Sequence, residues 1–143
     1  MPPPANLDFH LFALTPDSAA KVKHGDEPSK DGRLDVTSAD FRAFDVSMET
    51  LGEQLSNQPR CYFEWDGSFV WTGDTAGQDW TLSGMIYDTG ERISRVELRG
   101  TAPFAPVRQI TQWLEIQPHE LACQQMSTAA FISGLNLEKL FRA

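Results

Sequence analysis

The sequence predicts an α+β fold in which an antiparallel β-meander is packed on one face by helices. Three observations lead to this prediction. An Asp-Gly pair separates two aromatic and β-branched runs, two further alternating runs follow it, and segments of helical periodicity lie on both sides of these runs. The chain has 143 residues, which is the length of one domain, so we expect a single core formed by residues 1–143.

The first expected element is a strand over Leu7–Leu14. This run is apolar on both of its alternating faces, which is typical of a strand covered on two sides, and we expect it to join the sheet. Residues 15–35 are polar, charged and rich in helix- and strand-breaking residues, which predicts a mobile surface loop. Such a loop can be a lid or a partner-contacting segment, but its composition favours a solvated insertion.

A short strand at Phe41–Val46 and a helix at 48–57 are expected next. Ser47 suits the position before the helix, because its hydroxyl can accept a hydrogen bond from a free backbone N–H in the first turn. Pro59 ends the helical pattern. The apolar stripe of this helix consists of Met48, Leu51 and Leu55.

The strongest local signal is Asp66-Gly67, which predicts a β-hairpin closed by a two-residue turn. Such a turn would place Tyr62 opposite Trp71 and Glu64 opposite Phe69. Both faces of the hairpin would then carry large apolar groups, so either both are covered or one aromatic face is open to a partner. The candidate partner-binding face consists of Tyr62, Glu64, Phe69 and Trp71. The opposite face would show Phe63, Trp65 and Val70.

A second hairpin is expected from strands at Asp79–Tyr87 and Glu91–Arg99. A three-residue turn, Asp88-Thr89-Gly90, separates apolar from polar side chains and places the glycine at the left-handed position. A two-residue turn would instead mix charged residues into the apolar face. The expected cross-strand pairs are Trp80–Leu98, Thr81–Glu97, Leu82–Val96 and Ser83–Arg95.

The last third of the chain predicts two helices with an ambiguous segment between them. Pro106 suits the first position of a helix at 106–116, which has one apolar stripe. Residues 119–126 favour a helix by propensity but also alternate like a strand, and the sequence does not separate these alternatives. A short helix containing Leu137, Leu140 and Phe141 is expected to dock at the C-terminus.

Composition narrows the class of partner. The 20 acidic residues outnumber the 12 Lys and Arg residues, giving a formal net charge of −8. Binders of nucleic acid and of anionic membranes neutralise phosphate with basic residues, so we expect neither partner. The absence of a signal-like N-terminus and of a long apolar run predicts a soluble, cytoplasmic protein. Cys61 and Cys123 are then expected to be reduced and buried, although an oxidising compartment would permit a bridge.

Few residues suggest catalysis or metal binding. The chain lacks the glycine-rich phosphate loops and the G-x-S-x-G nucleophile motif. His119 and Cys123 would share one face of a helix, but zinc needs further ligands, so no metal or other cofactor is expected. His10 lies two residues from Asp8 on one strand face, a pair suited to proton transfer. Glu64 in an aromatic surround would have a raised pKa, whereas a solvent-facing Glu64 would not.

These observations favour a small, acidic, non-catalytic binding protein of the adaptor or inhibitor type, with a basic protein as its partner. One alternative is a small enzyme that uses His10 with Asp8, or Glu64, as its acid–base group. Another is a domain that self-assembles, for example as a homodimer, through the face that carries Tyr62 and Trp71.

Overall fold

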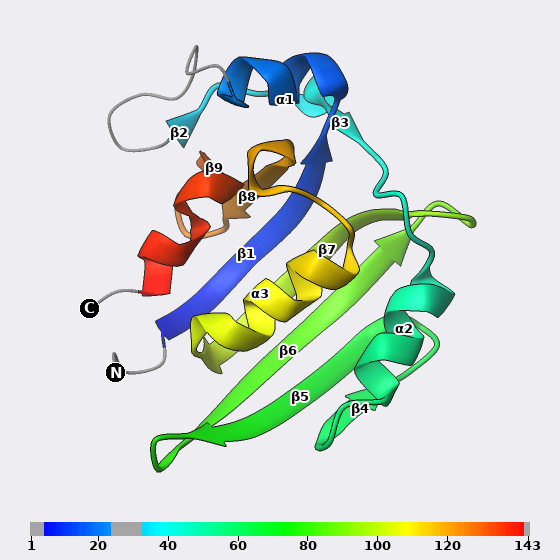
Figure 1. The fold of residues 1–143 in the computed structure, drawn as a ribbon, viewed down its shortest axis with the longest axis vertical. Helices are drawn as coiled ribbons and strands as arrows, with labels where there is room; N and C mark the ends of the chain where they lie inside the picture. The colour runs from blue at the N-terminus through cyan, green and yellow to red at the C-terminus, as the bar shows by residue number, and fades with distance from the viewer. Residues whose placement is uncertain (1–4, 24–32, 142–143) are drawn as a thin grey trace.

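The computed structural model describes residues 5–23 and 33–141, and this part of the chain forms one antiparallel sheet with helices (Figure 1). The sheet has nine strands. Eight follow the order β2-β9-β8-β1-β7-β6-β5-β4, and β3 pairs with β1. The consecutive strands β4 to β7 lie side by side, so the predicted α+β fold with a meander is confirmed. The expected first strand does join the sheet, between β7 and β8.

The bounds of the elements follow from backbone hydrogen bonding. The strands are β1 (Ala5–Leu14), β2 (Arg33–Leu34), β3 (Phe41–Arg42), β4 (Cys61–Phe63), β5 (Ser68–Thr75), β6 (Gln78–Asp88), β7 (Ile93–Ala102), β8 (Leu121–Gln125) and β9 (Phe131–Ser133). The α-helices are α1 (Pro16–Lys23), α2 (Met48–Ser56) and α3 (Phe104–Trp113), and the 3-10 helices are η1 (Ser38–Asp40), η2 (Pro118–Glu120) and η3 (Gly134–Phe141).

Three helical segments, α2, α3 and η3, lie on one face of the sheet, as expected (Figure 1). The main core fills the space beneath them with alternate residues of the strands, such as Leu11, Leu82 and Leu98, all fully buried. A second, smaller core lies on the opposite face at one end of the sheet, where Leu14 packs with Val22 of α1. β1 is therefore buried on both faces at this end, which explains its continuous apolar sequence.

The capping prediction for α2 is confirmed. The Ser47 hydroxyl accepts a hydrogen bond from the backbone N–H of Thr50 at 3.2 Å. α3 begins two residues earlier than expected, because Phe104 and Ala105 also adopt helical geometry ahead of Pro106. The ambiguous segment is resolved as the strand β8, preceded by one 3-10 turn at Pro118–Glu120.

The prediction of a loop over residues 15–35 is wrong at both ends, because residues 33–34 form the strand β2, which pairs with β9, and a helix lies at the start. Residues 16–23 form α1, which buries Ala19 and Val22 against the second core. Tertiary burial of this apolar pair stabilises a helix that its weak amphipathic pattern did not indicate. Residues 24–32, the centre of the expected loop, lie outside the described residues.

The predicted register of the first hairpin is wrong by one residue. Phe63 pairs with Phe69, and Tyr62 pairs with Val70. The chain turns over four residues, 64–67, closed by a hydrogen bond from the Gly67 N–H to the Glu64 carbonyl at 3.0 Å. A two-residue turn would need positive φ at both central residues, but only Gly67 has it, at 101°. The Asp66 carboxylate instead accepts from the Ser68 N–H at 2.9 Å, which stabilises the wider turn.

The second hairpin has the predicted faces but not the predicted pairs. Leu82 lies opposite Gly100 rather than Val96, a shift of four residues. The loop is longer than expected, with the Thr89 N–H bonded to the Arg92 carbonyl at 2.9 Å, and a bulge at Tyr87 and Asp88 lies just before it. Side chains alternate with a period of two, so an even shift leaves the same residues facing the core.

Candidate functional site

The uncovered face of the sheet is the first candidate site. Along β4 to β7 the described residues place no helix on the side opposite α2 and α3 (Figure 1). The register aligns one row of side chains across this side, from Tyr62 through Val70, Ser83 and Arg99 to Asp8 on β1. We call this side of β4 to β7, together with residues 8–10 of β1, the open sheet face.

Large apolar groups on the open sheet face are exposed at its β4 edge. Tyr62 is 73% exposed, and its cross-strand partner Val70 is 41% exposed. Trp65 is 66% exposed too, but its ring lies perpendicular to Phe63, whose ring packs on α2. The open sheet face therefore displays Tyr62 and Val70, whereas Trp65 belongs to the edge beside α2.

The structure separates the four residues of the sequence-predicted partner face. Tyr62 points to the open sheet face, but the one-residue shift turns Phe69 and Trp71 toward the helices. Phe69 is buried in the main core. The half-buried Trp71 ring lies 5.8 Å from the Trp80 ring and 5.7 Å from the Trp113 ring of α3. Phe69 and Trp71 thus join the sheet to its helices and do not share a surface with Tyr62.

Glu64 lies in the exposed turn between β4 and β5. Its backbone N–H donates to the Ser68 carbonyl at 2.9 Å, so the residue closes the hairpin. The aromatic surround that would desolvate its carboxyl does not form, because Phe69 and Trp71 face the other side of the sheet. Of the two environments considered for Glu64, the structure therefore shows the solvent-facing one.

His10 is buried on the open sheet face and has a different carboxylate partner from the one predicted. Its Nε2 lies 3.3 Å from Oε2 of Glu97 on β7, the strand that pairs with β1. The other Glu97 oxygen lies 3.8 Å from Nε of Arg99. Asp8 shares the strand face with His10 but sits opposite Arg99 in the register. Pairing of β1 with β7, which the sequence did not predict, brings Glu97 to His10.

Aromatic rings lie on both sides of His10. The His10 ring stacks between Phe12 and Tyr87, with centroids 6.4 Å away on each side. The Arg95 guanidinium lies 4.0 Å above the Tyr87 ring. The buried Nε of Arg95 has no hydrogen-bond partner within the described part of the chain. The cation–π contact therefore replaces part of the hydration that this guanidinium loses.

Both cysteines are buried free thiols, as expected. Burial raises the pKa of Cys61 to about 11 and raises the pKa of Cys123 further. The two residues lie on β4 and β8, with four strands between them. At about 4.8 Å per strand step they are roughly 24 Å apart, far beyond the reach of a disulfide. Neither thiol has the lowered pKa of a reactive cysteine.

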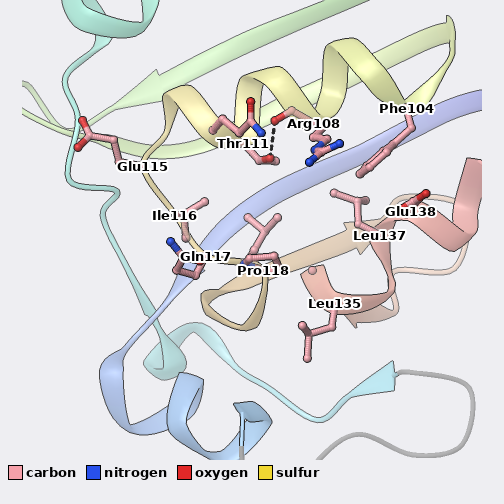
Figure 2. Close-up of a pocket in the computed structure, with 13 residues that line it drawn as sticks. Phe104, Arg108, Thr111, Glu115, Ile116, Gln117, Pro118, Leu135, Leu137 and Glu138 are labelled. Atoms are coloured by element: carbon pink, nitrogen blue, oxygen red, sulfur yellow. Dashed lines mark hydrogen bonds between the residues drawn. The ribbon is translucent and has the colours of Figure 1, made fainter.

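A groove between α3 and η3 is the second candidate site, and sequence reasoning missed it (Figure 2). It has a volume of about 850 Å³. Its floor is apolar, with Leu121 and Leu137 buried, and Arg108 and Gln112 of α3 form one wall. The sequence indicated only a helix with one apolar stripe in this part of the chain. The opposite wall comes from residues 134–138, which are distant in the sequence.

A smaller cavity of about 270 Å³ lies at the start of β1 and includes Asp8 and Leu140. Neither of the two cavities includes His10 or Glu64. Within residues 5–23 and 33–141, no three His, Cys, Asp or Glu side chains gather as a metal site would require. His119 lies in the 3-10 turn η2 and Cys123 in the strand β8, so the helical face that would align them does not exist.

Comparison with protein-family models, with curated proteins and with solved structures found no match. The function is therefore argued from the two surfaces alone. Among the helices of the described ranges, none combines the length and the apolar character needed to span a bilayer.

Proposed function

We propose that this chain is a non-catalytic interaction domain, of the adaptor or inhibitor type, that binds a protein through the open sheet face. The observation that carries the proposal is the exposure of Tyr62 and Val70, a cross-strand pair, on a face over which the described residues place no helix. A partner would remove both side chains from water, and tyrosine is favoured at such contacts because it is large and carries a polar tip.

The charges on the open sheet face support a protein partner more than a phosphate-rich one. The Glu97 carboxylate lies between His10 and Arg99, so this network is internally compensated. The net charge of −8 acts at longer range and favours approach of a basic protein. For the compartment we propose the cytoplasm, because two widely separated free thiols are compatible with a reducing environment.

A small enzyme is the weaker candidate. One contact supports it, the pair of His10 Nε2 and Glu97 Oε2 at 3.3 Å, which has the composition of an acid–base pair. His10 is packed between two aromatic rings and lines neither of the two cavities described above, so its pair with Glu97 is buried rather than presented at either cavity. We therefore rank binding through the open sheet face first.

The test compares the wild-type chain with the double variant Tyr62→Ser, Val70→Thr and with the control variant Trp65→Ser. Trp65 is similarly exposed but lies at the edge beside α2, so its replacement preserves the open sheet face. Each chain is used as bait for affinity capture with quantitative mass spectrometry, and its mass is followed by light scattering over a range of concentrations.

We expect a protein that the wild type and Trp65→Ser both capture and that the double variant loses by about tenfold or more. A dimer that dissociates only in the double variant would identify a second copy of this chain as the partner. Equal capture by all three chains, with no change in mass, would contradict the proposal.

A further inference from the structure

We propose that the groove between α3 and η3 binds a small organic carboxylate with an apolar body. This inference concerns the opposite side of the sheet from the open sheet face and rests on separate observations. It assigns the apolar body to the leucine-lined floor and the carboxylate to Arg108.

The walls of the groove are held in place by the main core. α3 and η3 run in opposite directions, since Phe104 at the start of α3 meets Phe141 at the end of η3, with ring centroids 5.1 Å apart. α3 is anchored by Ile110, and η3 by Leu137 and Phe141, all of them buried. The space between the two elements is therefore an open groove whose two walls are anchored segments, as a preformed ligand site requires.

The apolar part of the groove is larger than its buried floor. Leu121 and Leu137 form the floor, and the half-buried Phe104 closes one end. Leu135 also lines the groove and remains 54% exposed. A ligand with an apolar body would cover Leu135 and Phe104 and remove their surface from water, which is the favourable contribution of such contacts.

Arg108 supplies the charge that selects the ligand. It is the only Lys or Arg among the described residues that line the groove, and its side chain extends from α3 toward η3 (Figure 2). Its side chain is exposed, and the ion pairs identified within residues 5–23 and 33–141 do not include it. The acidic residues Glu115 and Glu138 lie at the two ends of the groove in the same view. An exposed cation that shares a groove with Phe104 and Leu137 fits an amphipathic anion.

The anion is better a carboxylate than a phosphate. One guanidinium matches one carboxylate through two parallel hydrogen bonds. A doubly charged phosphate would leave a charge uncompensated in a groove that also contains Glu115, in a chain of net charge −8. The volume of about 850 Å³ lies within the range of small-molecule sites, so a fatty-acid-like or aryl carboxylate fits.

The test uses decanoate as the probe and decanamide as its uncharged analogue. Binding is followed by ¹H–¹⁵N correlation spectra of the full chain, which give both the dissociation constant and the residues affected. The variants are Arg108→Gln, which removes the charge, and Leu135→Ser, which changes an exposed apolar wall residue without disturbing the core. Arg99→Gln is the matched control, because this exposed arginine lies on the open sheet face.

We expect saturable shifts confined to α3, η3 and residues 115–121. Arg108→Gln and decanamide are each expected to weaken binding about tenfold, Leu135→Ser a few-fold, and Arg99→Gln not at all. The inference is overturned if decanoate shifts do not saturate, if they lie elsewhere, or if Arg108→Gln and decanamide leave the dissociation constant unchanged. None of these results bears on capture through Tyr62 and Val70, so the two proposals fail independently.

Discussion

The close contact between Gly84 and Phe69 shows how one small residue fixes the position of an aromatic ring in this sheet. Gly84 lies on the core face of β6, directly opposite Phe69 of β5. A Cβ built on Gly84 would overlap both the Phe69 ring and the Glu97 backbone carbonyl. The ring therefore lies over the glycine, in space that any side chain at position 84 would occupy.

We predict that Gly84→Ala destabilises the fold by about 1–3 kcal/mol, the usual cost of an added methyl in a tightly packed core. The ring and the backbone would both have to move to accept it. The free energy of unfolding is measured by urea denaturation. Thr81→Ala, an exposed position on the other face of β6, is the control and should change stability by less than about 0.5 kcal/mol. An alanine at position 84 that leaves stability unchanged would contradict this packing.

At the scale of elements, Asp40 connects α1 to the segment before β3. One carboxylate oxygen accepts from the Ser18 hydroxyl of α1 at 2.7 Å, and the other accepts from the Thr37 backbone N–H at 2.8 Å. The Asp40 carbonyl accepts from the Thr15 N–H at 2.8 Å. The hydrogen bonds from the Thr37 N–H and then from Ser18 hold the pKa of Asp40 below its ordinary value.

We predict that Asp40→Asn lowers the free energy of unfolding by about 1 kcal/mol at pH 7, the typical net value of one intramolecular hydrogen bond, because the amide keeps only one of the two acceptor oxygens. A lowered pKa means that the folded state favours the ionised form. This stabilisation is present above the ordinary carboxyl pKa and is lost as the pH falls through the folded-state pKa. Denaturation curves between pH 7 and pH 3 should therefore show a shallower loss of stability in the variant.

The control for this prediction is Asp35→Asn, which replaces an exposed aspartate in the same region. It should leave both the stability at pH 7 and its pH dependence close to those of the wild type. Identical pH dependence in Asp40→Asn and the wild type would show that the Asp40 hydrogen bonds do not stabilise the position of α1.

At the scale of the whole molecule, the two thiols report on the stability of the complete sheet. Cys123 is fully buried between β1 and β9 near one end, and Cys61 lies on β4 at the other end. Burial favours the protonated thiol in both places, because a thiolate would lose its hydration. Neither thiol reacts readily unless the surrounding strands separate.

We predict that iodoacetamide labels Cys123 in the native chain at least about a hundredfold more slowly than in denaturant, because labelling requires opening of the core. Mass spectrometry of the alkylated chain measures the rate at each cysteine. Rapid labelling of Cys123 under native conditions would contradict its burial.

The same thiols predict a loss of stability at alkaline pH. The unfolded chain releases thiol protons at the ordinary pKa, whereas the folded chain retains the Cys61 proton up to about pH 11. The free energy of unfolding should therefore fall as the pH rises above the ordinary thiol value. Cys61→Ala should reduce this slope, and an unchanged slope would contradict the raised pKa.

The sequence by itself determined the fold class and the faces of most elements. Local patterns carry this information, because the alternation that puts Leu82 and Val96 in the core is independent of how far one strand slides by an even number of residues. The Ser47 cap and the segregation of Arg95 and Glu97 from the core follow from equally local properties.

Only the tertiary structure decided the two candidate sites. The partner face predicted from Asp66-Gly67 was lost through a one-residue shift, because contacts with β6 and the Asp66 side chain stabilise a wider turn. Glu97 reaches His10, and residues 134–138 reach α3, through pairing and docking of segments far apart in the chain. Such contacts depend on the summed burial of the whole core, which no short stretch of sequence records.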